Sequence, residues 1–294
     1  MTVGLAVVLV ALLGAGSSTA ATLNGVVGAR LGAWRATWLF FAVGTALAAA
    51  LVAATEREVL QAGRLASLSW YALLPGILNV IAVATVIRAV ARIGTLHTTA
   101  ATFSGATVAG LALDHVGAFG LPVLPAEGGR LVGAVLMIAA LVLITFAEPA
   151  RQRSASFLVA LGVFGIGAVD NVSWAINADT AAIAGPFTAT IAFLGPGALV
   201  LPLVFRARGV SMGRAFRIAD ATPGAYNVLA VAGAAWLLPF VGLHVANATR
   251  FVAAIATATA LDHLGAFGAR RIGATGHRVA ASVLLLLGLL ISMR

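Results

Sequence analysis

The chain alternates long apolar runs with short segments that carry most of its arginines. The runs have the length of helices that cross a bilayer, about 20 residues. The segments between them, such as "ATEREVLQAGR" and "FRARGVSMGRAFR", are too short to hold a soluble domain. The pattern therefore predicts an all-α integral membrane protein with about ten transmembrane helices. The predicted spans are residues 3–28, 36–54, 70–91, 95–113, 130–147, 155–179, 187–205, 223–242, 244–261 and 276–292.

The chain repeats itself once at a nearly constant offset. "ALDHVGAFG" at residues 112–120 returns as "ALDHLGAFG" at 260–268, and "PGILN" at 75–79 returns as "PGAYN" at 223–227. At the start of each half, Asn24 corresponds to Asn177 at a slightly larger offset. The sequence thus predicts two five-helix units, residues 1–150 and 151–294. Because five is odd, two directly joined units must cross the membrane in opposite directions, which is an architecture of secondary transporters.

Composition and charge support a membrane location and argue against a soluble protein, a nucleic-acid-binding protein and a metalloprotein. Hydrophobic residues make up 61% of the chain and charged residues 9%, too few charges to cover a soluble globule of this size. The formal charge of +9 comes from eighteen arginines scattered between apolar runs, so we expect no nucleic-acid partner. Thirteen of them fall in alternate loops or within a few residues of them, which puts both termini outside the cytoplasm. The chain has no cysteine, no P-loop and no zinc-ligand spacing, so we expect no metal and no cofactor.

Three stretches resemble a known family. They are "LNGVVGARLGAWRATWLFFAVGT" at residues 23–45, "LDHVGAFGLP" at 113–122 and "GGRLVGAVLMIAALVLI" at 128–144. They are similar to the YdcZ-like family of the drug/metabolite transporter (EamA-like) superfamily. That family includes single five-helix units, pairs and fused ten-helix chains, and this chain resembles a fused form. The resemblance implies membrane transport in the bacterial inner membrane without fixing a substrate.

The repeated Asp-His motif invites a chemical interpretation, but a structural one fits it better. The two copies are predicted at opposite membrane faces. This placement suits a contact that stabilises the turn between two helices better than it suits a single active site. An Asp at a helix C-terminus opposes the macrodipole and so needs a local partner; an arginine early in the next helix is the candidate. A proton relay through the histidines is the alternative. The residues concerned are Asp114, His115 and Arg130 in the first copy, and Asp262, His263 and Arg278 in the second.

The positions where the two copies differ are the better candidates for function. Asp170, Trp174 and Asn177 stand at i, i+4 and i+7 on the sixth predicted helix, and Arg250 lies inside the ninth. The corresponding residues of the first copy are Ser17, Ala21, Asn24 and Thr102. The predicted spans put Asp170 roughly 13 Å and Arg250 roughly 9 Å from the same face, so mutual pairing is expected. A buried ion pair that locks one half is one interpretation. The other is that Asp170 binds a cation or proton beside the face of Trp174.

Together these features predict a non-enzymatic secondary transporter that moves a small metabolite or organic cation by alternating access. Asp170, Trp174, Asn177, Asn24 and Arg250 are its candidate substrate-binding or coupling residues. A non-transporting scaffold and a membrane-embedded enzyme are the alternatives; an enzyme would need clustered catalytic side chains at one face. The expected partners are the lipid bilayer and a small-molecule substrate, and a homodimer stays open.

Overall fold

The computed structural model describes residues 2–56, 67–120, 123, 125–146, 150–207, 209, 216–241, 243–269, 271–273 and 275–292. In this part of the chain every regular element is helical. The α-helices are α1 (Val3–Leu31), α2 (Ala33–Thr55), α4 (Leu74–Val116), α5 (Gly128–Phe146), α6 (Ala150–Ala184), α7 (Pro186–Ala207), α8 (Thr222–Val241), α9 (Leu243–Leu264) and α10 (Gly276–Ser292). Short 3-10 helices are η2 (Trp70–Leu73), η3 (Ala118–Gly120), η4 (Ile218–Ala221) and η5 (Ala266–Gly268).

The helices fall close to the predicted spans, with two differences. The spans predicted at 70–91 and 95–113 form one element, α4, which is broken at Gly94 by the non-helical angles φ 81° and ψ 170°. Glycine tolerates this positive φ because it has no Cβ, so the chain turns there without a separate loop. α6 is longer than its predicted span of 155–179 and extends from Ala150 to Ala184.

Five of the described helical segments are long and apolar enough to cross a membrane. They are Gly4–Leu31, Ala33–Thr55, Trp70–Val116, Ala155–Ala184 and Pro186–Ala207. Large apolar side chains also face outward on other helices, including Val135 on α5 and Leu229 on α8. Such an exterior is unfavourable in water and suits lipid, in agreement with a membrane protein.

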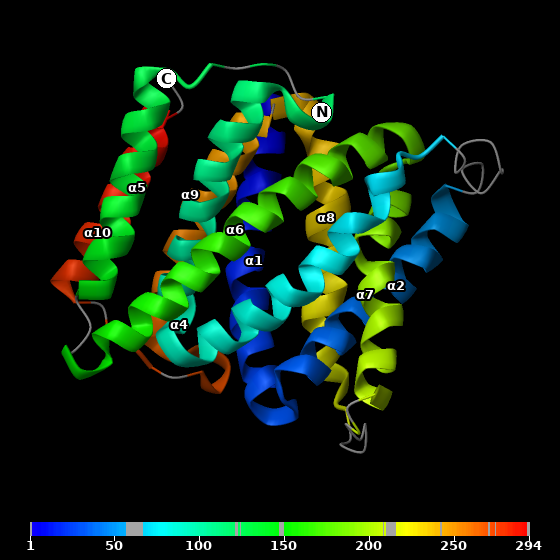
Figure 1. The fold of residues 1–294 in the computed structure, drawn as a ribbon, viewed down its shortest axis with the longest axis horizontal. Helices are drawn as coiled ribbons and strands as arrows, with labels where there is room; N and C mark the ends of the chain where they lie inside the picture. The colour runs from blue at the N-terminus through cyan, green and yellow to red at the C-terminus, as the bar shows by residue number, and fades with distance from the viewer. Residues whose placement is uncertain are drawn as a thin grey trace.

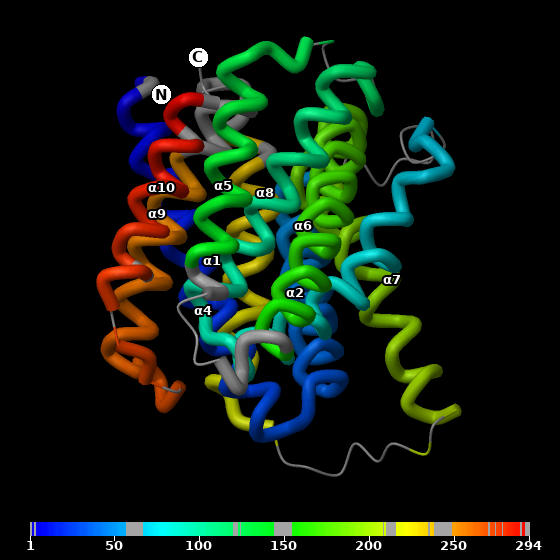
Figure 2. The backbone as a smooth tube through the Cα atoms, turned by 60° about the vertical axis from the view of Figure 1, so that its left-hand side comes forward, coloured from blue at the N-terminus to red at the C-terminus, as the bar shows by residue number. Residues whose placement is uncertain are grey.

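The bundle has α5 and α10 at one side and α2 and α7 at the other, with the remaining helices between them (Figure 1). α1 packs against α8 and α9, and α6 packs against α4 and α7. The start of α1 and the end of α10 lie at the same end of the bundle in both views (Figures 1 and 2). From that end α1 runs away, whereas α6 runs toward it.

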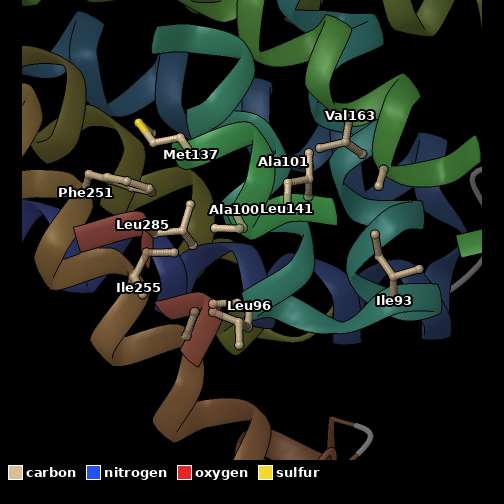
Figure 3. Packing of buried hydrophobic residues seen from close by; sticks show 14 of the residues in the cluster. Ile93, Leu96, Ala100, Ala101, Met137, Leu141, Val163, Phe251, Ile255 and Leu285 are labelled. Atoms are coloured by element: carbon tan, nitrogen blue, oxygen red, sulfur yellow. The ribbon is translucent and has the colours of Figure 1, made fainter. Parts of the chain in front are cut away.

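Two apolar clusters join the halves of the chain. The larger one combines Leu96 of α4, Met137 of α5, Phe251 of α9 and Leu285 of α10, all fully buried (Figure 3). The second places Phe41 of α2 against Leu194 and Leu201 of α7. Because both clusters draw on helices from both halves of the chain, the two halves pack against each other.

The turns repeat the duplication in their backbone angles. Gly32 joins α1 to α2 with φ 88°, and Gly185 joins α6 to α7 with φ 89°. After α4 and after α9, the phenylalanines of the repeated motif, Phe119 and Phe267, have φ 56° and 59°. A positive φ is uncommon for a residue with a side chain, so its recurrence at the same motif position shows that the sequence repeat specifies a repeated turn.

Candidate functional site

The first two residues predicted to share one face of the sixth helix, Asp170 and Trp174, are joined by a hydrogen bond. Trp174 lies one turn after Asp170 on α6, and its indole Nε1 donates to Asp170 Oδ2 over 3.1 Å. Helical geometry places i and i+4 side chains on one face, so the sequence alone specifies this pair. The Trp174 ring also packs on Phe193 of α7, with 5.6 Å between ring centroids.

Arg250 reaches this pair from α9. Its Cζ lies 4.8 Å from the centroid of the Trp174 ring, a cation–π arrangement. Its Nε is buried and has no hydrogen-bond acceptor among the described residues. The expected pairing of Asp170 with Arg250 is present as an electrostatic interaction between the two charges. The carboxylate is hydrogen-bonded to Trp174, and the guanidinium stacks on the same ring. The indole thus holds the carboxylate at its edge and the guanidinium over its face.

The similar depths inferred for the two charges also need correction. Since α6 continues to Ala184, Asp170 lies about 21 Å from the end of its helix at the usual rise per residue. Arg250 lies about 10 Å from the start of α9 by the same measure. The side chains still meet because α6 crosses the bundle obliquely (Figure 1).

Tyr226 belongs to the same neighbourhood and was missed by the sequence analysis. It lies on α8, within electrostatic range of Arg250. Its hydroxyl donates to the main-chain oxygen of Leu13 on α1, which also accepts from Ser17 Oγ over 2.8 Å. The first copy has Leu78 at the corresponding position. The comparison of copies that singled out Asp170 would therefore have found Tyr226 too.

Asn24 and Asn177 are not brought into contact with the charges. Both are buried, at 7% and 3% exposure, on α1 and α6. The described hydrogen bonds link neither of them to Asp170 or Arg250. Their burial also makes them poor positions for reporting water access, whereas Ser17 on α1 is partly exposed.

The Asp of the second Asp-His motif makes structural contacts that sequence spacing did not specify. Asp262 accepts from the main-chain N–H groups of Thr95 and Leu96, each over 2.9 Å, and so caps the helix that restarts after Gly94. It thus binds α4 of the other half as well as its own turn, where Ile272 N donates to the Asp262 main-chain oxygen over 2.7 Å.

In the first copy the expected pairing is present. Arg130 lies 3.5 Å from Asp114. His115 and His263 are exposed, and the side chain of Arg278 lies outside the described residues. The same described part of the chain holds no group of three His, Asp or Glu that could bind a metal ion.

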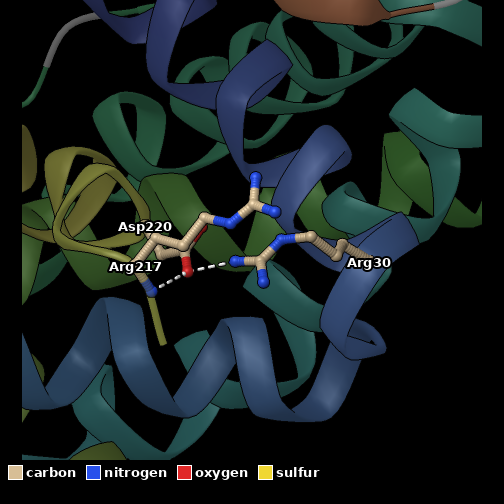
Figure 4. A network of polar contacts seen from close by, with 3 residues as sticks. All are labelled: Arg30, Arg217 and Asp220. Carbon is tan, nitrogen blue, oxygen red and sulfur yellow. Dashed lines mark hydrogen bonds and ion pairs between the residues drawn. The ribbon is translucent and has the colours of Figure 1, made fainter. Parts of the chain in front are cut away.

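An ion pair between Arg30 and Asp220, called here a polar tie, joins the halves at the end of the bundle where α1 meets α2. Asp220 of η4 accepts from the Arg30 guanidinium of α1 and, over 2.7 Å, from the main-chain N–H of Arg217 (Figure 4). Burial of Asp220 disfavours its charge. The hydrogen bonds from Arg30 and Arg217, together with their charges, outweigh this and lower the pKa of Asp220 below its ordinary value of 3.8.

A second set of ties lies at the opposite end. Asp179 of α6 accepts from Tyr71 of η2 over 3.2 Å. Glu56, at the end of α2, accepts from the main-chain N–H groups of Phe187 and Thr188 over 3.0 Å each. η2 and η4 occupy equivalent positions in the two copies, so each end has a contact between a first helix and the 3-10 turn of the other half.

We expect Asp220→Asn to lower the melting temperature at neutral pH, by about 5 °C for the loss of about 2 kcal/mol of charge-assisted hydrogen bonding. Because the folded pKa lies below 3.8, ionised Asp220 stabilises the fold fully above that value. This contribution is lost as the pH falls through the folded pKa. The difference between wild type and variant should therefore narrow below about pH 4. Thermal unfolding in detergent across this range measures it.

The control is Glu127→Gln, which removes an exposed loop carboxylate and should change little. A gap between wild type and Asp220→Asn that stays constant as the pH is lowered would contradict the assignment.

The fold and its lipid-facing exterior define a multi-pass helical membrane protein. Two segments, residues 5–143 and 158–291, match the model of the family described as "Putative inner membrane exporter, YdcZ". The chain belongs to this YdcZ family, as the resemblance predicted. Membership supports location in the inner membrane and a role in transport.

A solved structure described as "Crystal structure of protein" is similar over 98% of this chain and 95% of its own, with a TM-score of 0.62. Sequence identity is 15%, so the likeness concerns the fold alone. No curated protein matches the chain.

Proposed function

We propose that the protein is a secondary transporter that exports a small molecule by alternating access of two inverted five-helix units, residues 1–150 and 151–294. On this proposal the chain crosses the membrane ten times, the two halves of α4 on either side of Gly94 counting as separate spans. The arginine-rich end is cytoplasmic, and both termini lie outside. The opposite directions of α1 and α6 support this arrangement.

The observation that carries the proposal is a pair of equivalent close contacts between the halves. In one contact a glycine of the first half meets the backbone of the second half, and in the other the equivalent glycine of the second half meets the backbone of the first. Gly14 of α1 lies so close to the Arg250 backbone of α9 that a Cβ would overlap it. Gly167 of α6 lies equally close to the Thr102 backbone of α4. The equivalent of Gly14 is Gly167, and the equivalent of Arg250 is Thr102.

A second pair of contacts behaves in the same way. A Cβ on Gly76 would meet Pro196, and one on Gly224 would meet Val43. Exchanging the halves converts one contact into the other. Two packed halves related in this way can rock between an inward-open and an outward-open state that the pseudo-two-fold axis of the repeats relates, which is how inverted repeats give access to alternate faces.

The candidate binding site is the cluster of Asp170, Trp174, Arg250 and Tyr226, which Ser17 and Leu13 of α1 border from the first half. Ionisable groups inside a membrane bundle are costly and mark substrate pathways. The ties at the two ends, Arg30–Asp220 and Glu56–Thr188, are the contacts that would open in turn.

Weakening the contact at one end of the bundle, Arg30–Asp220 or Glu56–Thr188, should make the candidate site more accessible to water from that end. In the cysteine-free chain, Ser17→Cys is labelled with a membrane-impermeant maleimide in right-side-out and in inverted membrane vesicles. Adding Asp220→Asn should raise labelling from the arginine-rich face about fivefold and lower it from the other, the effect of about 1 kcal/mol on a two-state equilibrium. Adding Glu56→Gln should do the reverse.

The reciprocal change is the decisive result, because a scaffold has no reason to trade access at one face for access at the other. Labelling that neither substitution alters, or that both alter in the same direction, would refute alternating access. Glu127→Gln serves as the matched loss of an exposed carboxylate and should leave both rates unchanged.

A further inference from the structure

Arg250 and Asp170 keep hydrogen-bonding capacity that the protein itself does not use. A guanidinium has five N–H donors, yet among the described residues Arg250 donates no hydrogen bond, and its contact is the face of Trp174. Asp170 accepts a hydrogen bond through Oδ2 from Trp174 Nε1; no described donor reaches Oδ1. The two charges thus compensate each other electrostatically without sharing a hydrogen bond.

This arrangement suits a ligand with two opposite charges. The planar guanidinium matches a carboxylate, with which it forms two parallel hydrogen bonds. The Asp170 carboxylate matches an ammonium group in the same charge-assisted way. Trp174 holds the two protein charges more than 4.0 Å apart, since they form no ion pair within that distance in the described structure. A small ligand can therefore span them without first breaking a salt bridge.

Net charge decides between ligand classes. A cation attracted by Asp170 is repelled by Arg250, and an anion attracted by Arg250 is repelled by Asp170; in a medium of low dielectric constant both penalties are large. The Trp174 face that would attract an organic cation is occupied by Arg250. A zwitterion satisfies both groups and leaves the site neutral.

We propose that this site takes a small zwitterion carrying a carboxylate and an ammonium group, as an α-amino acid does, with the carboxylate on Arg250 and the ammonium on Asp170. The inference rests on the proposed transport function. The packed rings of Trp174 and Phe193 form an apolar wall beside the charges, so an apolar substituent on the zwitterion would lie against these rings.

The test is thermal stabilisation of the purified full-length protein, followed by its tryptophan fluorescence. The probes are glycine, leucine and phenylalanine, each compared with its methyl ester, which lacks the carboxylate charge, and its N-acetyl derivative, which lacks the ammonium charge. At least one amino acid should raise the melting temperature by about 5 °C at a hundredfold excess over its Kd, and its two derivatives should not.

Arg250→Gln and Asp170→Asn should each abolish the shift. The matched control is Arg88→Gln, which removes another arginine stacked on a tryptophan, Trp34, at 4.7 Å, and should leave the shift intact. Both site variants are near in size to the residues they replace, and their own melting curves report whether they fold. If a site variant does not fold, the derivative series on the wild type decides.

Failure of this inference is distinct from failure of the proposed function. Stabilisation by the methyl esters alone would identify an organic cation as the ligand and overturn the zwitterion. No preference for any of the three amino acids over its derivatives would also overturn it. In both cases a reciprocal change in Ser17→Cys labelling leaves alternating access standing, whereas its absence removes the transporter itself.

Discussion

Replacing Gly167 with alanine should destabilise the protein by about 3 kcal/mol, the upper part of the range for an overpacked contact. The added Cβ would overlap the main-chain carbonyl of Thr102 on α4. A backbone carbonyl within a helix cannot rotate away as a side chain can, so α4 and α6 must separate. Small residues let membrane helices approach closely, and the packing they allow helps to hold such helices together. This contact lies where the two halves of the chain meet. Thermal unfolding in detergent should show a loss of about 6–12 °C.

The same helix supplies the control. A Cβ on Gly165, two residues away, meets nothing within 4 Å. Gly165→Ala should therefore be neutral or slightly stabilising, because alanine favours the helix over glycine. Equal losses from the two substitutions would show that helix propensity or lipid exposure, and not the contact with Thr102, explains the effect of Gly167→Ala.

The duplicated contact makes Gly14→Ala the counterpart experiment. Here the Cβ would overlap the backbone of Arg250, so α9 must move away from α1 and take the guanidinium with it. This variant should lose as much stability as Gly167→Ala, and a ligand should also raise its melting temperature less than that of wild type. In Gly167→Ala the displaced partner, Thr102, carries no charge, so this variant should lose stability but keep the ligand-induced rise.

Asp262→Ala should cost about 2–4 kcal/mol, because it leaves the buried N–H groups of Thr95 and Leu96 without an acceptor. Asp262 is 3% exposed, so water replaces it poorly. Asp262→Asn keeps one acceptor oxygen and should fall between wild type and Asp262→Ala. Melting temperatures of the three proteins give the order.

Glu127→Ala, which removes an exposed acid, should stay within about 0.5 kcal/mol of wild type. If Asp262→Ala stayed equally close to wild type, the capping contact would contribute nothing to stability, and the break in α4 at Gly94 would need another cause. A loss confined to Asp262→Ala would show that the second half's motif holds the break in α4 of the first half.

The sequence by itself determined the class of protein, the approximate helices and the duplication. Apolar runs of bilayer length and the spacing of "ALDHVGAFG" are properties of neighbouring residues, and helix formation depends on neighbours. The contact of Trp174 with Asp170 was predictable for the same reason, because four residues along a helix bring two side chains to one face. Family membership followed from the same local stretches.

Only the tertiary structure decided the partners that come from distant parts of the chain. Arg250 lies over Trp174 and not against Asp170, Asp262 caps a helix 167 residues earlier, and Arg30 binds Asp220 across 190 residues. Counting residues along a helix gives a depth, but not the helix's tilt or the side on which its neighbour packs. Those depend on how glycines such as Gly14 and Gly167 let the helices approach, and that packing places one charge at the edge of the Trp174 indole and the opposite charge over its face.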